Sequence, residues 1–125
     1  KIIDGEIPCY KIAEDDYFFA FLDINPVAKG HVLVVPKEEV DIFFKLEDTT
    51  LSNILPFCKK VSKAIESVVT CIRIGLNVVG LEVPHAHVHL IPISRMGDIS
   101  FANPKVKMTN EEFELLAKQI RDQFV

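Results

Sequence analysis

The chain has 125 residues, of which 49% are hydrophobic, so it can bury one compact core and is short for two domains. The formal net charge is −4 and the 14 basic residues form no Lys/Arg block, which argues against a polyanion-binding face and a nucleic-acid partner. No apolar run approaches the ~18 residues that a membrane span needs, which argues against a membrane partner.

A β-hairpin is the first predicted element, in residues 9–26, CYKIAEDDYFFAFLDINP. Two aromatic and β-branched runs flank the acidic residues 14–16, and Asn25-Pro26 ends the second run. A strand over 31–35 follows and ends at Pro36. Its nearly continuous apolar character predicts burial on both faces.

An amphipathic helix is predicted over 48–69, because apolar residues recur there at steps of three and four. Asp48 or Thr49 is the expected N-cap. Pro56 lies deep inside this pattern, so we expect a kink there or a regular part that starts just before it.

A second helix is predicted over about 109–124, where Thr109 and Glu112 form the pattern of a capping box. Residues 94–108 show no regular period. Together with two strands over 71–79 and 85–93, these elements predict an α+β fold. We expect about five mostly antiparallel strands and two main helices in a single domain.

Three cysteines, Cys9, Cys58 and Cys71, are odd in number and widely spaced, with no CxxC pair. This argues against a zinc ribbon or a redox motif and favours free thiols in a reducing cytosol. The opening KIIDGEIP carries charges inside its apolar segment, unlike a secretory signal. We therefore expect a cytoplasmic protein.

The segment HAHVHLIPI places His85, His87 and His89 on alternate positions of the strand predicted over 85–93. Side chains at i, i+2 and i+4 of a strand share one face, so we expect the three rings to line one side. A row of imidazoles in an apolar strand costs free energy unless each ring has a partner. The row therefore indicates a site rather than unrelated structural histidines.

Two chemistries compete for this row. A zinc site is the first, but His85 and His89 start ~13 Å apart, so only a neighbouring pair with a carboxylate or His31 could converge on one ion. Nucleophilic catalysis on phosphorus is the second and favoured interpretation, because neutral imidazole is a good nucleophile near its pKa of ~6.5. A row with this spacing also suits a chain of phosphates.

The motif HAHVHLI fits His-x-His-x-His followed by two apolar residues, and KIIDGEIP, AFLDINP and GHVLVVPK precede it in order. In these motifs the chain resembles the histidine-triad (HIT) nucleotide-binding superfamily over roughly residues 1–94, and most of all its purine nucleoside phosphoramidase branch. The resemblance implies a HIT-like antiparallel sheet with two helices, one HIT domain over 1–125 with a C-terminal extension, and a homodimer.

The same resemblance implies that the chain binds a purine mononucleotide or AMP conjugate and hydrolyses it at the α-phosphate. The reaction would pass through a covalent nucleotidyl-histidine intermediate and need no cofactor or metal. A dinucleoside polyphosphate hydrolase, a nucleotide-binding regulatory module with little turnover and a metal-binding protein remain as alternatives.

By position, the resemblance assigns catalytic roles to four histidines: the nucleophile His87, its orienting neighbour His85, the phosphate contact His89 and the supporting His31. It also implies six nucleotide-binding positions: Phe21, Asp23, Ile24 and Ile2 on base and ribose, and Asn77 and Glu82 near the phosphate. The loop before His85 looks shorter than in well-known members. Glu82 in that loop is expected to alter the choice of leaving group, because a carboxylate repels phosphate unless it is protonated or faces a basic amine.

Overall fold

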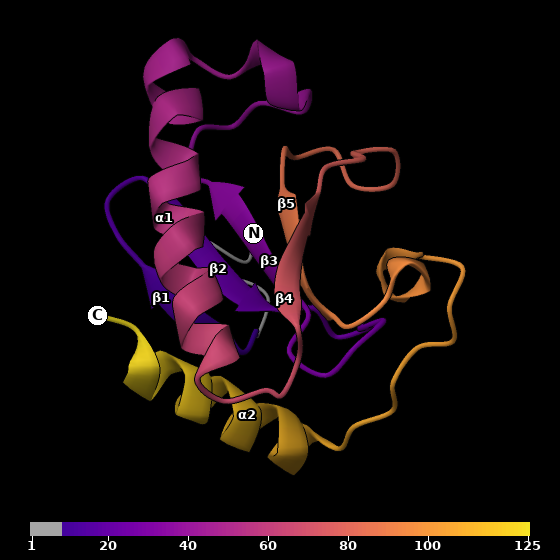
Figure 1. Ribbon diagram of the computed structural model, residues 1–125. Coiled ribbons are helices and arrows are strands. Elements are labelled where there is room, and N and C mark those ends of the chain that lie inside the picture. Colours follow the sequence, from indigo (N-terminus) through magenta and orange to yellow (C-terminus); the bar gives the residue numbers. More distant parts are fainter. Residues whose placement is uncertain (1–8) are drawn as a thin grey trace.

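The computed structural model describes residues 9–125, and its centre is one five-stranded sheet (Figure 1). The strand order is β1-β2-β3-β5-β4, and every pair of neighbouring strands is antiparallel. With its two α-helices, the sheet confirms the predicted α+β fold of about five antiparallel strands and two main helices. The strands are β1 Lys11–Glu14, β2 Phe18–Leu22, β3 Val32–Pro36, β4 Arg73–Asn77 and β5 Val88–Ile93.

Helices α1, Asp48–Glu66, and α2, Asn110–Gln123, pack against one face of the sheet (Figure 1). Alternate strand residues point toward the helices and form the main core, because a strand places successive side chains on opposite faces. This leaves the other face of the sheet for the histidines. The largest fully buried apolar side chains of this core are Ile12, Phe18, Val32, Val34, Ile54, Val61, Ile65, Leu90, Leu116 and Ile120.

The beginning of α1 differs from the sequence prediction. The N-cap is Glu47, which makes no side-chain capping hydrogen bond, so neither Asp48 nor Thr49 is the cap. The distant Glu38 serves instead, since its carboxylate accepts from the Glu47 backbone N–H at 3.2 Å and from the Thr50 hydroxyl at 2.6 Å. A side chain nine residues upstream thus accepts a hydrogen bond from one of the backbone N–H groups that have no partner within the helix.

Helix α1 continues through Pro56 and ends at Glu66, three residues before the end expected from the periodicity. In α2 the capping box is present as predicted, with Thr109 Oγ1 accepting from the Glu112 N–H at 3.1 Å and Glu112 Oε1 accepting from the Thr109 N–H at 2.7 Å. Inside the stretch 94–108, expected to be irregular, one short 3-10 helix forms over Met96–Ile99. No helix within residues 9–125 is long and apolar enough to cross a bilayer.

Strand β5 begins at Val88, three residues later than the predicted start, and this is the main correction to the sequence analysis. The register pairs Val34 with Val88, so continuation would place Pro36 opposite Ala86. Proline has no N–H to donate to a ladder. The Ala86 N–H bonds instead to the Val40 carbonyl at 2.8 Å, and the chain leaves the sheet before His87.

Candidate active site

The face of the sheet opposite the helices carries a straight row of side chains across four strands. Phe21 on β2 pairs with Leu33 on β3, Leu33 pairs with His89 on β5, and His89 pairs with Asn77 on β4. Directly opposed residues share a face, and neighbouring strands lie about 4.8 Å apart. Asn77 is therefore a direct neighbour of His89, while Phe21 is two strands, or about 10 Å, away.

His87 lies just before β5, with only 9% of its surface exposed. Its Nδ1 is 2.8 Å from the backbone carbonyl oxygen of His85. A carbonyl oxygen can only accept, so Nδ1 must carry the hydrogen and donate it. In the neutral ring Nε2 then keeps a free lone pair. This is the tautomer that a nucleophilic imidazole requires.

A second pair of rings, His31 and His89, forms a hydrogen-bonded chain with a fixed direction. The Val27 backbone N–H donates to His31 Nδ1 at 3.2 Å, which requires a bare Nδ1 and hence a hydrogen on His31 Nε2. His31 Nε2 lies 3.0 Å from His89 Nδ1 and donates to it. His89 therefore carries its hydrogen on Nε2, where it remains available to an acceptor such as a phosphate oxygen.

Burial keeps both of these rings neutral. Desolvation is the largest cause that lowers the pKa of His89 to about 4, and the charges of His31 and His87 lower it further, against a smaller opposing effect of Asp23. Desolvation also lowers the pKa of His31, which is 1% exposed. At neutral pH the hydrogen-bonded rings of His31 and His89 are therefore two uncharged imidazoles rather than a cationic pair.

Asp23 lies beside this chain. Its Oδ2 is 3.5 Å from His31 Nε2, and its Oδ1 accepts from the Asn25 backbone N–H at 2.8 Å. Ligand atoms of Asp23, His31 and His89 lie within 4.8 Å of one another, a grouping that could surround a cation. A metal would, however, need a bare His31 Nε2, and the hydrogen would then move to Nδ1, where it faces the Val27 N–H. The existing hydrogen bonds thus favour a hydrogen-bonded pair His31–His89 with fixed tautomers over a metal centre.

The remaining expected site residues are spread more widely. The His85 ring does not join the other two, because its Nε2 donates to the Pro36 carbonyl at 2.7 Å. His85 nevertheless acts on His87 through its backbone carbonyl. The expectation that the three rings lie on one side therefore holds for His87 and His89, whose ring centroids are 4.9 Å apart, and is wrong for His85. It is also wrong that all three belong to the strand, since only His89 lies within β5.

The positions expected to bind base and ribose also lie in different places. Phe21 is buried against Phe19 and Val35 on the histidine-bearing face, whereas Ile24 is exposed and lines a hollow beside α2 that contains no histidine. Glu82 is exposed in the loop that precedes His85. Ile2 lies outside the described residues.

Two contributors to the site carry no sequence signal. One is the backbone N–H of Val27, which sets the tautomer of His31. The other is Phe101, whose ring centroid lies 4.6 Å from that of His89 and 6.3 Å from that of His31. Phe101 comes from the stretch without regular period, so neither spacing nor composition indicated it.

The chain matches the family model of the HIT domain over residues 4–96. Adenosine 5'-monophosphoramidase hnt1 of Schizosaccharomyces pombe is 37% identical over 122 residues, covering 96% of this chain and 92% of the relative. An uncharacterized HIT-like protein of Borreliella burgdorferi is 38% identical over 128 residues, with the same two coverages.

Among solved structures, a hypothetical histidine triad nucleotide-binding protein from Sulfolobus tokodaii strain7 superposes with a TM-score of 0.85 at 32% identity. The matched region covers 98% of this chain and 88% of the Sulfolobus tokodaii chain. Sequence and fold agree: the expected HIT-like fold is confirmed, and we conclude that the chain belongs to the HIT domain family.

Proposed function

We propose that the chain is a purine nucleotide hydrolase that cleaves AMP derivatives, such as nucleoside phosphoramidates, at the α-phosphorus. The observation that carries this proposal is the hydrogen bond from His87 Nδ1 to the His85 carbonyl, since it leaves Nε2 as a free nucleophile. The name of the Schizosaccharomyces pombe relative, an adenosine 5'-monophosphoramidase, supports the substrate class.

The reaction would proceed as two displacements. In the first, the lone pair of His87 Nε2 forms a P–N bond while the bond from phosphorus to the leaving nitrogen breaks, and that nitrogen takes up a proton from solvent and departs as the amine. In the second, water attacks phosphorus and releases a proton to solvent. The electron pair of the P–N bond returns to His87 Nε2, which releases AMP and the neutral ring. Covalent catalysis of this kind replaces one difficult displacement with two easier ones.

His89 and Asn77 are the proposed phosphate contacts. Because the His31–His89 chain ends in an Nε2–H on His89, that hydrogen can bond a phosphate oxygen as charge develops there. Asn77 stands directly opposite in the register and offers an amide to the same group. We assign base and ribose contacts to Phe21, Asp23, Ile24 and Ile2 on the strength of the family resemblance.

Glu82 is the proposed determinant of leaving-group choice. Its carboxylate lies on the exposed loop before His85 and would repel a phosphate leaving group while attracting a protonated amine. Glu82→Ser is therefore expected to narrow the preference for amine over phosphate leaving groups. If the ratio of the hydrolysis rate with an amine leaving group to that with a phosphate leaving group is unchanged, Glu82 does not belong to the site.

A homodimer in the cytoplasm is the proposed state of the chain. Among residues 9–125, β4 pairs with β5 alone, so its outer edge presents free backbone groups. Beside this edge lies an apolar groove of about 730 Å³, whose lining includes Leu55 of α1, Leu76 of β4 and the proposed nucleophile His87, so the proposed interface adjoins the active site. An open edge next to an apolar groove suits pairing with a second copy. Cys9, Cys58 and Cys71 are unpaired thiols, in keeping with a reducing compartment.

A rapid-quench experiment with adenosine phosphoramidate tests the proposed reaction. Intact protein is expected to gain the mass of one AMP moiety, mapped to His87, before steady-state turnover. His87→Asn is the matched variant, because its amide can replace Nδ1 as donor to the His85 carbonyl but provides no Nε2. It is expected to bind AMP and to form no adduct.

Turnover that persists in His87→Asn contradicts the mechanism. AMP binding without any turnover by the wild type indicates a regulatory module. Faster cleavage of a diadenosine polyphosphate than of the phosphoramidate places the chain in the dinucleoside polyphosphate hydrolase class, and loss of AMP binding on chelation indicates a metal-binding protein.

A further inference from the structure

Residues 94–108, here called the strap, cross the histidine-bearing face of the sheet on their way to α2. At the near end, the Asp98 carboxylate accepts from the backbone N–H groups of Ser94 and Arg95 at 2.8 and 3.1 Å, which fixes the turn. At the far end, the Val106 N–H donates to the Pro26 carbonyl at 2.8 Å. The near end, which continues directly from β5, is thus held by a turn within the strap, and the far end is tied to the fold at Pro26.

The middle of the strap is seated on β4 through a glycine. A Cβ on Gly75 would lie 2.9 Å from Cδ1 of Ile99, so the Ile99 side chain occupies the space that Gly75 leaves open. Gly75 and Asn77 are two residues apart on one strand and share a face, which is the face that carries His89. Ile99 therefore anchors the strap on the same surface as the proposed phosphate contacts.

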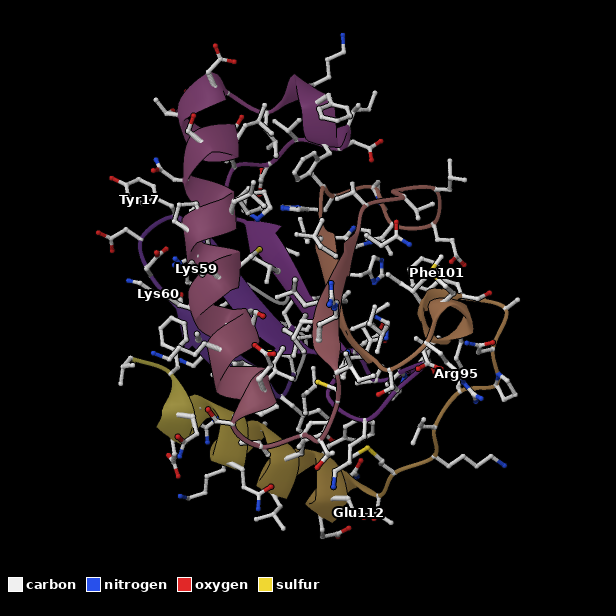
Figure 2. All side chains as sticks on the ribbon, in the orientation of Figure 1. Tyr17, Lys59, Lys60, Arg95, Phe101 and Glu112 are labelled. Carbon is white, nitrogen blue, oxygen red and sulfur yellow. The ribbon has the colours of Figure 1, made fainter. Side chains whose placement is uncertain are left out.

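Phe101 follows this anchor, close to the short helix Met96–Ile99 on the segment that runs to α2 (Figure 2). Its ring is tilted by 54° against His89 with centroids 4.6 Å apart, and it lies nearly parallel to His31 at 6.3 Å. Its backbone carbonyl accepts from Lys105 Nζ at 2.9 Å, within the strap itself. Contacts with both rings of the hydrogen-bonded chain come from this one side chain.

We infer that Phe101 is a positioning residue for the proposed reaction: its ring holds the His89 imidazole so that Nδ1 accepts from His31 and Nε2–H stays free for a phosphate oxygen. The assignment depends on the proposed function, because this orientation serves catalysis only if His89 contacts the substrate. Without Phe101, water could reach His89 Nδ1 and compete with the His31 hydrogen bond.

Hydration would also change the titration of His89. The ionisable groups that face it are His31 at the start of β3, Asp23 after β2 and His87 before β5, while Lys105 on the strap acts on His31. Burial is the main reason why the pKa of His89 is lowered to about 4. Removing the aromatic cover is therefore expected to raise this pKa toward its ordinary value.

The test compares the full-length wild type with Phe101→Ala by ring ¹⁵N–¹H NMR and by rapid quench with adenosine phosphoramidate. In Phe101→Ala the pKa of His89 is expected to rise by about one pH unit or more, with loss of the pure Nε2–H tautomer. Adduct formation is expected to slow by about ten- to a hundredfold with little change in KM, as for a misplaced catalytic group. Phe101→Leu is expected to restore most of both properties and remains informative if the alanine variant folds poorly.

Phe124→Ala is the matched control. Phe124 is also half-buried, but it packs on Phe57 with centroids 5.8 Å apart on the helix side of the sheet. This variant is expected to lower Tm while leaving the His89 tautomer and titration as in the wild type. A wild-type tautomer and pKa of His89 in Phe101→Ala would overturn the positioning role, whereas a wild type that forms no adduct would overturn the proposed function instead.

Discussion

Replacing His89 with asparagine isolates the effect of one buried imidazole on stability as a function of pH. The asparagine Oδ1 can take the place of Nδ1 and accept the hydrogen bond that His31 Nε2 now donates at 3.0 Å. The hydrogen-bonded chain is thus retained, while the ionisable group is removed. Any difference in pH dependence between the two proteins then comes from the titration of His89.

The sign follows from the lowered pKa of His89. The unfolded chain titrates this group near 6.5 and the folded chain at about 4, so between these values the unfolded state binds more protons. The free energy of unfolding of the wild type must therefore decrease as pH falls from about 6.5 toward 4. The pKa difference corresponds to about 3 kcal/mol in full, and we expect about half of this because the side chain is partly exposed to solvent.

Urea unfolding at pH 7 and pH 4.5 measures this difference. His89→Asn is expected to lose about 1–2 kcal/mol less stability over that interval than the wild type does, after the loss common to both from carboxylate protonation is subtracted. At pH 7 His89 is neutral in both states, so the comparison there serves as the reference. Equal losses in the two proteins would refute the conclusion that burial holds His89 neutral.

Three further predictions concern single substitutions elsewhere. Gly30→Ala is expected to lower the free energy of unfolding by about 2 kcal/mol or more, because Gly30 has φ +93° and a Cβ there would lie 2.9 Å from Cγ2 of Val69. A Tm within error of the wild-type value would contradict this prediction. Thr109→Ala is expected to lower it by about 1 kcal/mol through loss of the capping box, measured by urea unfolding, and no loss would mean that the cap contributes little. Leu76→Lys in the groove beside the open edge of β4 is expected to convert the proposed dimer to a monomer in a sizing experiment, and an unchanged elution volume would place the interface elsewhere.

Local signals were read correctly from the sequence where the interacting groups are close along the chain. The capping box of α2 is an example, since Thr109 and Glu112 are three residues apart and bond one another. The start of α1 is the opposite case, because its carboxylate acceptor, Glu38, is reached only after the chain has turned. The start of β5 was misplaced for the same reason, since Pro36 on a different strand ends the ladder.

The candidate site shows the same limit. The alternation of histidines indicated a site, but the partner of each ring is a group distant in sequence or on the backbone. His31 and His89 are 58 residues apart, and the tautomer of His31 depends on the Val27 N–H. Phe101 belongs to a segment whose path follows only from its anchors on β4 and at Pro26. No periodicity encodes such a path.

The missing amide hydrogen of Pro36 has a consequence for how this enzyme architecture can diversify. Because strand pairing stops before His87, the peptide that connects β4 with this proposed nucleophile is held by carbonyls of loops instead of by a neighbouring strand. Residues can therefore be inserted or deleted in that connection without shifting the alignment of β5 against β3. In the proposed hydrolase, new substrate preferences can arise there while the hydrogen-bonded pair His31–His89, held by β3 and β5, keeps its geometry.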